Sequence, residues 1–122
     1  MRIPSLLLAK LYVKGSLRNE GDGFQFRIKN VLAPGTVVKI LALDVDGREY
    51  PTEQVFLLMN AEEKIEAIEI SSQRPLSLEL GGEVTVQLRG ERLSAGPREI
   101  SLTLRTRELG ELRLPLRDTI EG

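Results

Sequence analysis

Residues 100–117 read ISLTLRTRELGELRLPLR, and leucine or isoleucine recurs there at every second position on both sides of a central turn. This period of two predicts two β-strands, each with one buried and one exposed face. A three-residue loop at 108–110 that ends in glycine is typical of a hairpin turn with a glycine bulge. Parity then places Leu104 opposite Leu114. On the exposed face, the same register places Arg105 opposite Arg113, Arg107 opposite Glu111, and Ser101 opposite Arg117.

A second hairpin is predicted near the start of the chain, where residues 11–17 (LYVKGSL) and residues 24–28 (FQFRI) both alternate. The segment between them contains two glycines, and a loop of either residues 20–21 or residues 19–22 satisfies parity. This register places Leu17 opposite Phe24 and Val13 opposite Ile28.

The middle of the chain predicts a long strand and a short return. Residues 36–45 are so continuously apolar that we expect a central strand covered on both faces. Asp46-Gly47 is a strong hairpin dipeptide, which returns the chain through residues 48–50 until Pro51 ends the pairing.

Residues 52–75 fit two interpretations. Residues 54–59 (QVFLLM) suit a buried strand or the start of a helix, and Asn60-Ala61-Glu62-Glu63 has the form of a helix N-cap followed by a capping-box glutamate. Residues 68–70 (IEI) alternate, however, and this alternation favours strand, turn and strand with one helical turn.

The remaining pattern settles the fold class. Residues 76–80 and 84–88 alternate on either side of Gly81-Gly82. Together with the segments above, they give about eight or nine short strands separated by turn signals. This arrangement predicts an all-β fold, an antiparallel β-sandwich, as a single domain over residues 1–122.

The composition excludes several classes of function. The sequence contains neither histidine nor cysteine, and so it lacks the commonest general base, the commonest transition-metal ligand and the thiolate nucleophile. We therefore predict no catalytic residue, no metal site and no cofactor. A formal net charge of -1 argues against nucleic acid as a partner. No apolar run is long enough for a membrane span or a signal peptide, so the sequence predicts a cytoplasmic protein without membrane contact.

Short acidic motifs in the chain give no strong site. Asp44-Val45-Asp46-Gly47 resembles a fragment of a calcium loop, but it lacks the third acid and the closing glutamate, and a hairpin turn explains it. Glu62-Glu63 and the pair Glu66 and Glu69 suit a solvated face better than an acid–base pair, because catalytic carboxyls need apolar neighbours.

The exposed face of the last hairpin carries the candidate ligand-binding residues, which are Arg105, Arg107, Arg113 and Arg117. Guanidinium groups suit carboxylates and phosphates, so one interpretation is a site for an anionic ligand such as a sugar phosphate or an acyl-CoA, or for a carbohydrate. The other interpretation is a surface ion network with Glu99, Glu108 and Glu111, or with a partner chain. Arginine outnumbers lysine 12 to 5 and glutamate outnumbers aspartate 14 to 4. This composition indicates a thermophilic source and favours the ion network.

The first residues are unusually apolar for a chain end and carry the candidate interface residues, which are Ile3, Leu6, Leu7, Leu8 and Leu11. One interpretation is a first sandwich strand that runs on into residues 11–13. The other is an edge strand or arm that pairs with another subunit. In a helix, Leu7, Leu8 and Leu11 would form a stripe.

Four segments carry a resemblance to a known family. They are residues 3–5 (IPS), 11–17 (LYVKGSL), 23–26 (GFQF) and 32–36 (LAPGT). With these segments the chain resembles a family of small archaeal and thermophile proteins that is sometimes labelled hydroxymethylglutaryl-CoA reductase. That reductase is a much larger enzyme with a nicotinamide site and a catalytic histidine, so from this chain we expect no oxidation of nicotinamide.

A looser resemblance rests mostly on turns, at residues 45–49 (VDGRE), 81–82 (GG) and 93–97 (LSAGP). In these the chain is similar to the small β subunit of C-glycoside deglycosidases. The resemblance implies a β-sandwich beside a separate, metal-dependent barrel subunit, and it assigns no functional residue to this chain.

These observations lead to two expectations for function. The first is a non-catalytic β-sandwich module that acts through self-association or as an accessory subunit of an enzyme complex. The second is a small-molecule binding domain that uses the arginine-rich face of the last hairpin.

Overall fold

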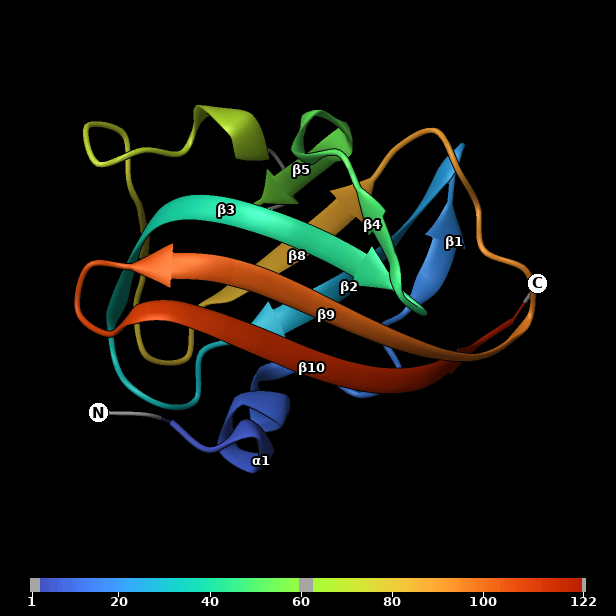
Figure 1. Cartoon of the computed structure of the whole chain (residues 1–122), viewed down its shortest axis with the longest axis horizontal. Coiled ribbons are helices and arrows are strands. Elements are labelled where there is room, and N and C mark those ends of the chain that lie inside the picture. The colour runs from blue at the N-terminus through green and yellow to red at the C-terminus, as the bar shows by residue number, and fades with distance from the viewer. Residues whose placement is uncertain (1–2, 60–62, 122) are drawn as a thin grey trace.

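Alternating apolar residues give two β-sheets whose buried faces meet, as Figure 1 shows for the computed structural model, which describes residues 3–59 and 63–121. The strands in these residues are β1 Arg18–Glu20, β2 Gly23–Lys29, β3 Gly35–Val45, β4 Arg48–Tyr50, β5 Val55–Leu58, β6 Lys64–Glu66, β7 Leu76–Leu78, β8 Glu83–Leu88, β9 Gly96–Thr106 and β10 Gly110–Ile120. One sheet has the order β1-β2-β8-β5-β6, and the other has the order β10-β9-β3-β4 with β7 also paired to β3. The predicted all-β antiparallel sandwich is therefore confirmed.

Strands β2 and β8 illustrate how the sequence fills the space between the sheets. Their register places Phe24 opposite Leu88, Phe26 opposite Val86, and Ile28 opposite Val84. All of these side chains are buried, and the alternate residue Arg27 is exposed. Burying one such apolar side chain stabilises the fold by about 1.5–3 kcal/mol, so these cross-strand pairs contribute a large share of the core.

Strand β3 is central, as predicted, with β9 on one side and β4 and β7 on the other. Register shifts follow Val37 and Ile40, and each inserts an extra residue into the strand. The buried positions are therefore spaced unevenly, at Val37, Ile40, Leu43 and Val45. Val38 and Leu41 are only half-buried, so the expectation that both faces are covered is wrong. The continuous apolar run instead reflects the two bulges.

The turn after β3 has the predicted form. Asp46 and Gly47 have φ angles of 51° and 89°, which are the positive values that a two-residue hairpin of this kind needs. Val45 pairs with Arg48, and β4 ends at Tyr50, directly before Pro51. The short length of β4 follows from this proline, because it cannot donate to the ladder.

The last hairpin has the predicted strands in a register that differs by two residues. Gly110 lies opposite Thr106, so the loop is residues 107–109, and Gly110 takes a positive φ of 72°. The Thr106 hydroxyl accepts a hydrogen bond from the Leu109 N–H at 2.9 Å and donates one to the Gly110 carbonyl at 3.1 Å, which fixes this turn. The observed cross-strand pairs are Leu104 with Leu112, Arg105 with Glu111, Thr103 with Arg113, Ser101 with Pro115, and Glu99 with Arg117. The predicted pairs on both faces are therefore wrong.

The first hairpin lies further along the chain than predicted, because residues 11–17 hold the end of η1, one isolated bridge and a turn, and the first strand is β1. The predicted strand over residues 11–17 is therefore wrong, and the register of the hairpin also differs from the predicted one by two residues. Asn19 lies opposite Phe24 and Glu20 opposite Gly23, which leaves a two-residue turn at 21–22. The Asn19 side chain is held by the backbone of Leu93, from which it accepts one hydrogen bond and to which it donates another, each at 2.9 Å. This long-range contact is absent from any local pattern, and it explains why parity alone gave the wrong register.

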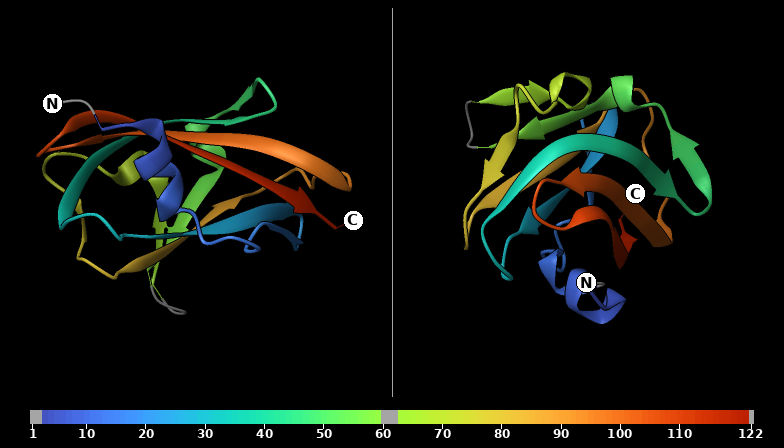
Figure 2. Two further views of the ribbon diagram at one scale, coloured as in Figure 1. Left: turned by 90° about the horizontal axis from the view of Figure 1, so that it is seen from below. Right: turned by 60° about the vertical axis from the view of Figure 1, so that its left-hand side comes forward.

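The apolar start of the chain is helical, so the predicted first strand is wrong. Helix α1 covers Ser5–Leu8, and a 3-10 turn, η1, covers Ala9–Leu11. The Pro4 carbonyl accepts hydrogen bonds from the N–H groups of Leu7 at 3.0 Å and Leu8 at 3.2 Å. Beyond η1, Tyr12 makes one isolated bridge to Ile28, and the expected Val13–Ile28 pair does not form. Figure 2 shows α1 across the open side of the sandwich next to β10.

The region after β4 holds strand, turn and strand, as favoured, but the second strand is β6 at residues 64–66 and not the alternating residues 68–70, which lie in and just after a 3-10 turn. A 3-10 turn, η2 (Thr52–Gln54), precedes β5, and another, η3 (Ala67–Glu69), follows β6. The proposed N-cap at Asn60 lies outside the described residues, and Glu63 is not helical. Across residues 3–59 and 63–121, no helix is long and apolar enough to cross a membrane.

The backbone of β8 lies so close to Gly23, the first residue of β2, that a substitution there tests how the two strands pack. A Cβ atom added at Gly23 would lie 1.7 Å from the Leu88 carbonyl oxygen, whereas a Cβ at Gly35 would meet nothing closer than 3.9 Å. We expect Gly23→Ala to lower the free energy of unfolding by about 3 kcal/mol, because the backbone of β8 must move. Gly35→Ala, the control, should leave it unchanged or raise it by up to about 1 kcal/mol. Urea unfolding of both variants measures this, and equal stabilities would contradict the close approach.

Candidate functional site

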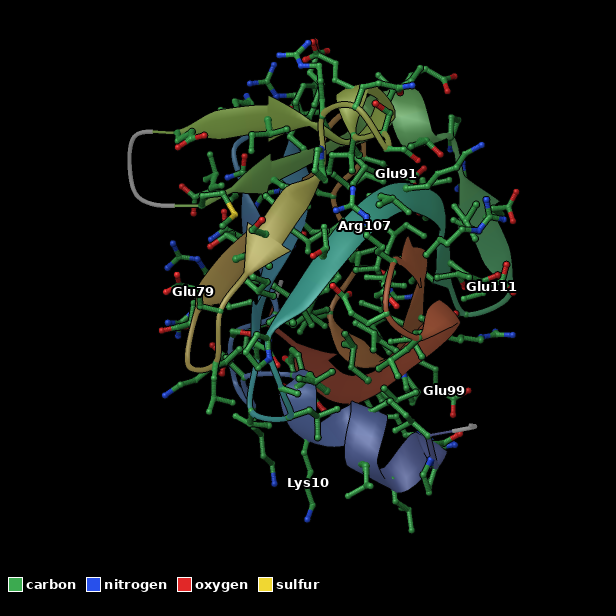
Figure 3. All side chains as sticks on the ribbon, turned by 90° about the vertical axis from the view of Figure 1, so that its left-hand side faces the viewer. Lys10, Glu79, Glu91, Glu99, Arg107 and Glu111 are labelled. Atoms are coloured by element: carbon green, nitrogen blue, oxygen red, sulfur yellow. The ribbon has the colours of Figure 1, made fainter. Side chains whose placement is uncertain are left out.

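An apolar pocket opens between the two sheets at the end of the sandwich that carries the β9–β10 turn. Its volume is about 120 Å³. We call it the end pocket, and its apolar walls include Leu11, Leu57, Val84, Leu102, Leu104 and Leu114. Figure 3 looks onto this end of the molecule, with α1 below and the strand β3 above. Residues of both sheets and Leu11 of η1 therefore line the same pocket.

The few polar groups that line the end pocket are already bonded to the protein. Asn30 donates to the carbonyls of Ala33 at 2.8 Å and Leu78 at 2.9 Å, and its side-chain oxygen accepts from the Leu32 N–H at 3.2 Å. Both oxygens of Glu108 accept hydrogen bonds from Thr36 at 2.8 Å, one from its N–H and one from its hydroxyl. These bonds lower the pKa of Glu108, the backbone N–H being the larger cause. The Thr106 hydroxyl is used in the turn. The polar side chains that line the pocket are therefore occupied by the protein itself, and the surface offered to a ligand is apolar.

An unfilled apolar space of this size has a cost for stability. Mutational cavities cost about 24 cal/mol per Å³, so a void of 120 Å³ corresponds to about 3 kcal/mol relative to a filled core. The rim carries apolar side chains that remain in water, with Leu32 36% and Leu109 44% exposed. An apolar lining with an apolar rim is typical of a site that receives an apolar group.

No sequence pattern predicted the end pocket. A signal for it exists in the placement of the five aromatic residues, which all precede residue 57. Tyr12 packs edge-on against Phe26, and Phe24 against Tyr50, with ring centroids 6.4 Å and 6.0 Å apart. None of these rings lines the pocket, so that end of the core is filled by aliphatic side chains alone.

The four predicted ligand-binding arginines are all exposed, and they lie in different surroundings. Arg105 lies between Lys39 on β3 and Glu111 on β10. Arg107 is in the turn, where its Nη2 donates to the Ser72 carbonyl at 3.4 Å. In Figure 3, Arg107 and Glu111 lie well apart.

The other two arginines share a surface hollow of mixed charge. Arg113 and Arg117 line it together with Asp44 and Glu99, and Arg117 forms an ion pair with Glu99. Acidic side chains beside the guanidinium groups weaken the attraction for an anion. Binding of an anionic ligand at this face stays a prediction.

The predicted interface residues divide into a buried and an exposed set. Leu8 and Leu11 belong to the core, and Ile3 packs against it. Leu6 is 83% exposed and Leu7 39% exposed on the same short helix. The segment is therefore held to the sandwich by one side and presents leucine to solvent on the other.

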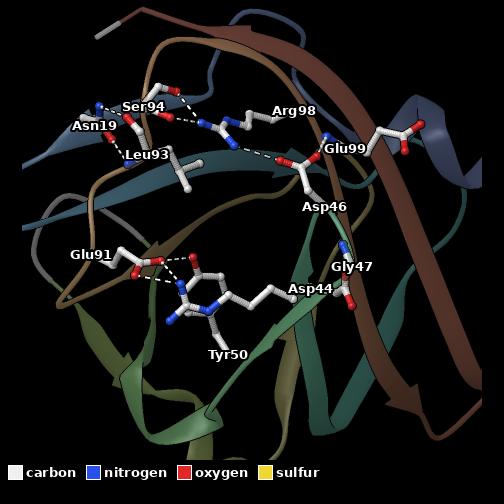
Figure 4. A network of polar contacts seen from close by, with 11 residues as sticks. Asn19, Asp44, Asp46, Gly47, Tyr50, Glu91, Leu93, Ser94, Arg98 and Glu99 are labelled. Atoms are coloured by element: carbon white, nitrogen blue, oxygen red, sulfur yellow. Dashed lines mark hydrogen bonds and ion pairs between the residues drawn. The ribbon is translucent and has the colours of Figure 1, made fainter.

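A network of charged and polar groups holds the loop of residues 89–95, and Figure 4 shows it from close by. Arg48 donates to both oxygens of Glu91 at 2.9 and 3.0 Å, and the Tyr50 hydroxyl donates to the same carboxylate. The Arg48 guanidinium lies 4.9 Å from the centre of the Tyr50 ring. Burial, and then the hydrogen bond to Glu91, raise the pKa of Tyr50 to about 12, and the Tyr50 hydrogen bond lowers the pKa of Glu91.

A second part of the network joins this loop to the β3–β4 turn. Arg98 donates through Nη1 to Asp46 at 2.9 Å and through Nη2 to the Ser94 carbonyl at 2.7 Å and to the Ser94 hydroxyl. Asp46 also accepts from the Glu99 N–H at 2.9 Å, which is the largest cause of its lowered pKa. Each oxygen of the Asp46 carboxylate therefore accepts a hydrogen bond from β9, which ties the β3–β4 turn to that strand.

The acidic motifs singled out in the sequence lie in turn and surface contacts. Among residues 3–59 and 63–121, no three acidic side chains lie close enough together to hold a metal ion. Asp44 accepts from the Gly47 N–H at 2.9 Å, as a turn residue does. Of the proposed carboxyl pairs, Glu62 lies outside the described residues, and Glu69 pairs with Arg74 at 3.4 Å on the surface.

The Tyr50–Glu91 contact predicts a pH dependence. The raised pKa means that the folded state binds its phenol proton more tightly, so this contribution to stability is full below pH 10 and is lost as pH rises through about 12. In a Tyr12→Phe background Tyr50 is the one remaining tyrosine, and phenolate absorbance should report a pKa near 12.

The matched comparison is between Glu91→Gln and Glu111→Gln in that background. Glu91→Gln should move the phenol pKa part of the way back toward 10, because burial remains the larger cause of the shift. Glu111→Gln changes an exposed carboxylate in another part of the surface and should leave it unchanged. An unaltered titration in Glu91→Gln would show that the carboxylate does not act on Tyr50.

Comparison with known proteins adds one finding about ancestry. The family described as "Hydroxymethylglutaryl-CoA reductase, N-terminal domain" matches residues 7–121, which is nearly the whole chain. No curated protein matches it. The match includes every strand of both sheets and Leu11 of η1, which lines the end pocket. The chain therefore belongs to the family of the hydroxymethylglutaryl-CoA reductase N-terminal domain.

Proposed function

We propose that the protein is a non-catalytic β-sandwich module that acts by associating with another polypeptide, and that this polypeptide is a second copy of the same chain. The observation that carries the proposal is the pair of exposed leucines on α1, Leu6 and Leu7, next to Leu8 and Leu11 in the core. The buried pair fixes the helix, so that the exposed pair is presented on a defined surface.

The chemical inventory supports association over catalysis. The chain has no histidine or cysteine, and the carboxylates of Asp46, Glu91 and Glu108 are each tied to turn or loop groups. Their pKa values are lowered, which is opposite to what a general acid at neutral pH requires. The family description names an N-terminal domain of a reductase, and a domain of this kind fits a module that stands beside a catalytic part.

The sheet edges favour an association through side chains. Strands β1, β4 and β6 have three residues each, which gives little backbone to pair. The long edge strand β10 contains Pro115, and α1 lies against it. Short edges and an edge proline are the features by which proteins prevent strand-to-strand pairing.

A second copy of the chain is the simplest partner, because it requires no binding surface other than the leucines of α1. In a two-fold pair, one surface patch contacts the same patch of the other copy, so Leu6 and Leu7 would serve both sides. The formal net charge of -1 also leaves little repulsion between copies.

The molar mass in solution, measured by sedimentation at about 100 µM and after tenfold dilution, tests this proposal. We expect a dimer at the higher concentration, and we expect the double variant Leu6→Glu/Leu7→Glu to be a monomer with unchanged thermal stability. Ile68→Glu is the matched control, because Ile68 is 57% exposed on η3 and lies outside the proposed surface. A strict monomer, or a dimer that persists in the double variant, contradicts the proposal.

The second candidate function is binding of an anionic ligand near Arg113, which forms no ion pair with a carboxylate of residues 3–59 and 63–121. A thermal-shift series with phosphate and citrate tests it. Because Asp44 and Glu99 line the same hollow, we expect shifts no larger than those of chloride at equal ionic strength. A phosphate-specific shift that disappears in Arg113→Ala and persists in Arg89→Ala would reverse this expectation.

A further inference from the structure

We infer that the end pocket is a binding site for a short alkyl or aromatic group of a small amphiphilic molecule, whose polar end stays in water. This site is separate from the α1 surface. The inference rests on three observations: the chemistry of the walls, the volume, and the side chains at the rim.

The walls exclude a polar guest. Asn30, Thr106 and Glu108 are the hydrogen-bonding side chains that line the pocket, and each is bonded to backbone or side-chain groups of the protein. A hydroxyl or charged group inside would therefore lose its water and gain no partner, which is a strongly unfavourable exchange. The part of a ligand that enters must be hydrocarbon.

The volume limits the size of the guest. A dry apolar cavity of about 150 Å³ is known to accept benzene, and the end pocket measures about 120 Å³. A group of about five or six carbons therefore fills it. A longer chain must leave its remaining carbons outside.

The rim provides an entrance that does not require the sheets to separate. Ala33 and Pro34 are exposed in the loop after β2, and Leu109 is exposed in the β9–β10 turn across from it. These side chains cover the carbons next to the buried group. The charged side chain that lines the pocket, Glu108, is fixed by Thr36, so it neither blocks the entrance nor recognises the polar end.

A series of n-alkanols from butanol to decanol tests the inference on the full chain, by NMR titration of backbone amides. We expect the affinity to rise about fourfold with each methylene while the chain fills the pocket, and then to level off near six carbons. The shifted amides should be those of pocket-lining residues such as Leu57, Val84 and Leu104. An affinity that climbs steadily to decanol, or shifts spread over the surface, would mean non-specific adsorption and overturn the site.

Two alanines give a matched pair of variants that leave the core unchanged. Ala33 lines the pocket rim and Ala95 lies in the exposed loop before β9, outside the pocket. Ala33→Phe should weaken hexanol binding at least tenfold, and Ala95→Phe should leave it within twofold. Val84→Leu, which fills part of the pocket from inside, should shorten the optimal alkanol by one or two carbons. Equal binding by all three variants would contradict the proposal.

The same titration of Leu6→Glu/Leu7→Glu separates this inference from the proposed self-association. We expect full alkanol affinity in that variant whatever its molar mass, because Leu6 and Leu7 do not line the pocket. Loss of alkanol binding there, with the fold intact, would mean that the pocket depends on the α1 surface and is not a separate site.

Discussion

The structure depends on filling the space between two sheets with side chains that are mostly aliphatic. Two facing sheets stand about 10 Å apart, a gap that large side chains fill more completely than small ones. Here Phe24, Phe26 and Tyr50 occupy one end of the gap, while Phe56 lies beneath Lys64 and Arg89, each 4.5 Å from its ring centre. The other end is left to leucine, isoleucine and valine, and the end pocket is the consequence.

The same constraint explains what the sequence predicted well. An alternation of buried and exposed residues is required wherever one face of a strand closes the core, so β2, β8, β9 and β10 were evident from their leucines, valines and phenylalanines. The turn at Asp46-Gly47 was evident too, because few residues accept its positive φ values.

Register was the feature that local patterns did not determine. Parity distinguishes inward from outward side chains, and a shift by two residues preserves it. Both hairpins are shifted in this way. Leu93 holds Asn19 in the first hairpin from far along the chain, and in the last hairpin the local bonds of the Thr106 hydroxyl are joined by the distant contact between Thr36 and Glu108. The candidate site was missed for a related reason, because an unfilled volume is a property of the assembled core and has no motif.

The contact between the two ends of the chain has a consequence for the order of folding. Asp118 in β10 accepts hydrogen bonds from the Tyr12 hydroxyl at 2.6 Å and from the Gly15 N–H at 2.8 Å, across 106 and 103 residues. Such distant pairings are slow to form, since the more than 100 residues between the partners must be in place first. On the ribosome, the leucines of α1 and η1 therefore emerge early and stay uncovered until β10 has been made. This interval is one in which a chaperone would protect the nascent chain from aggregation.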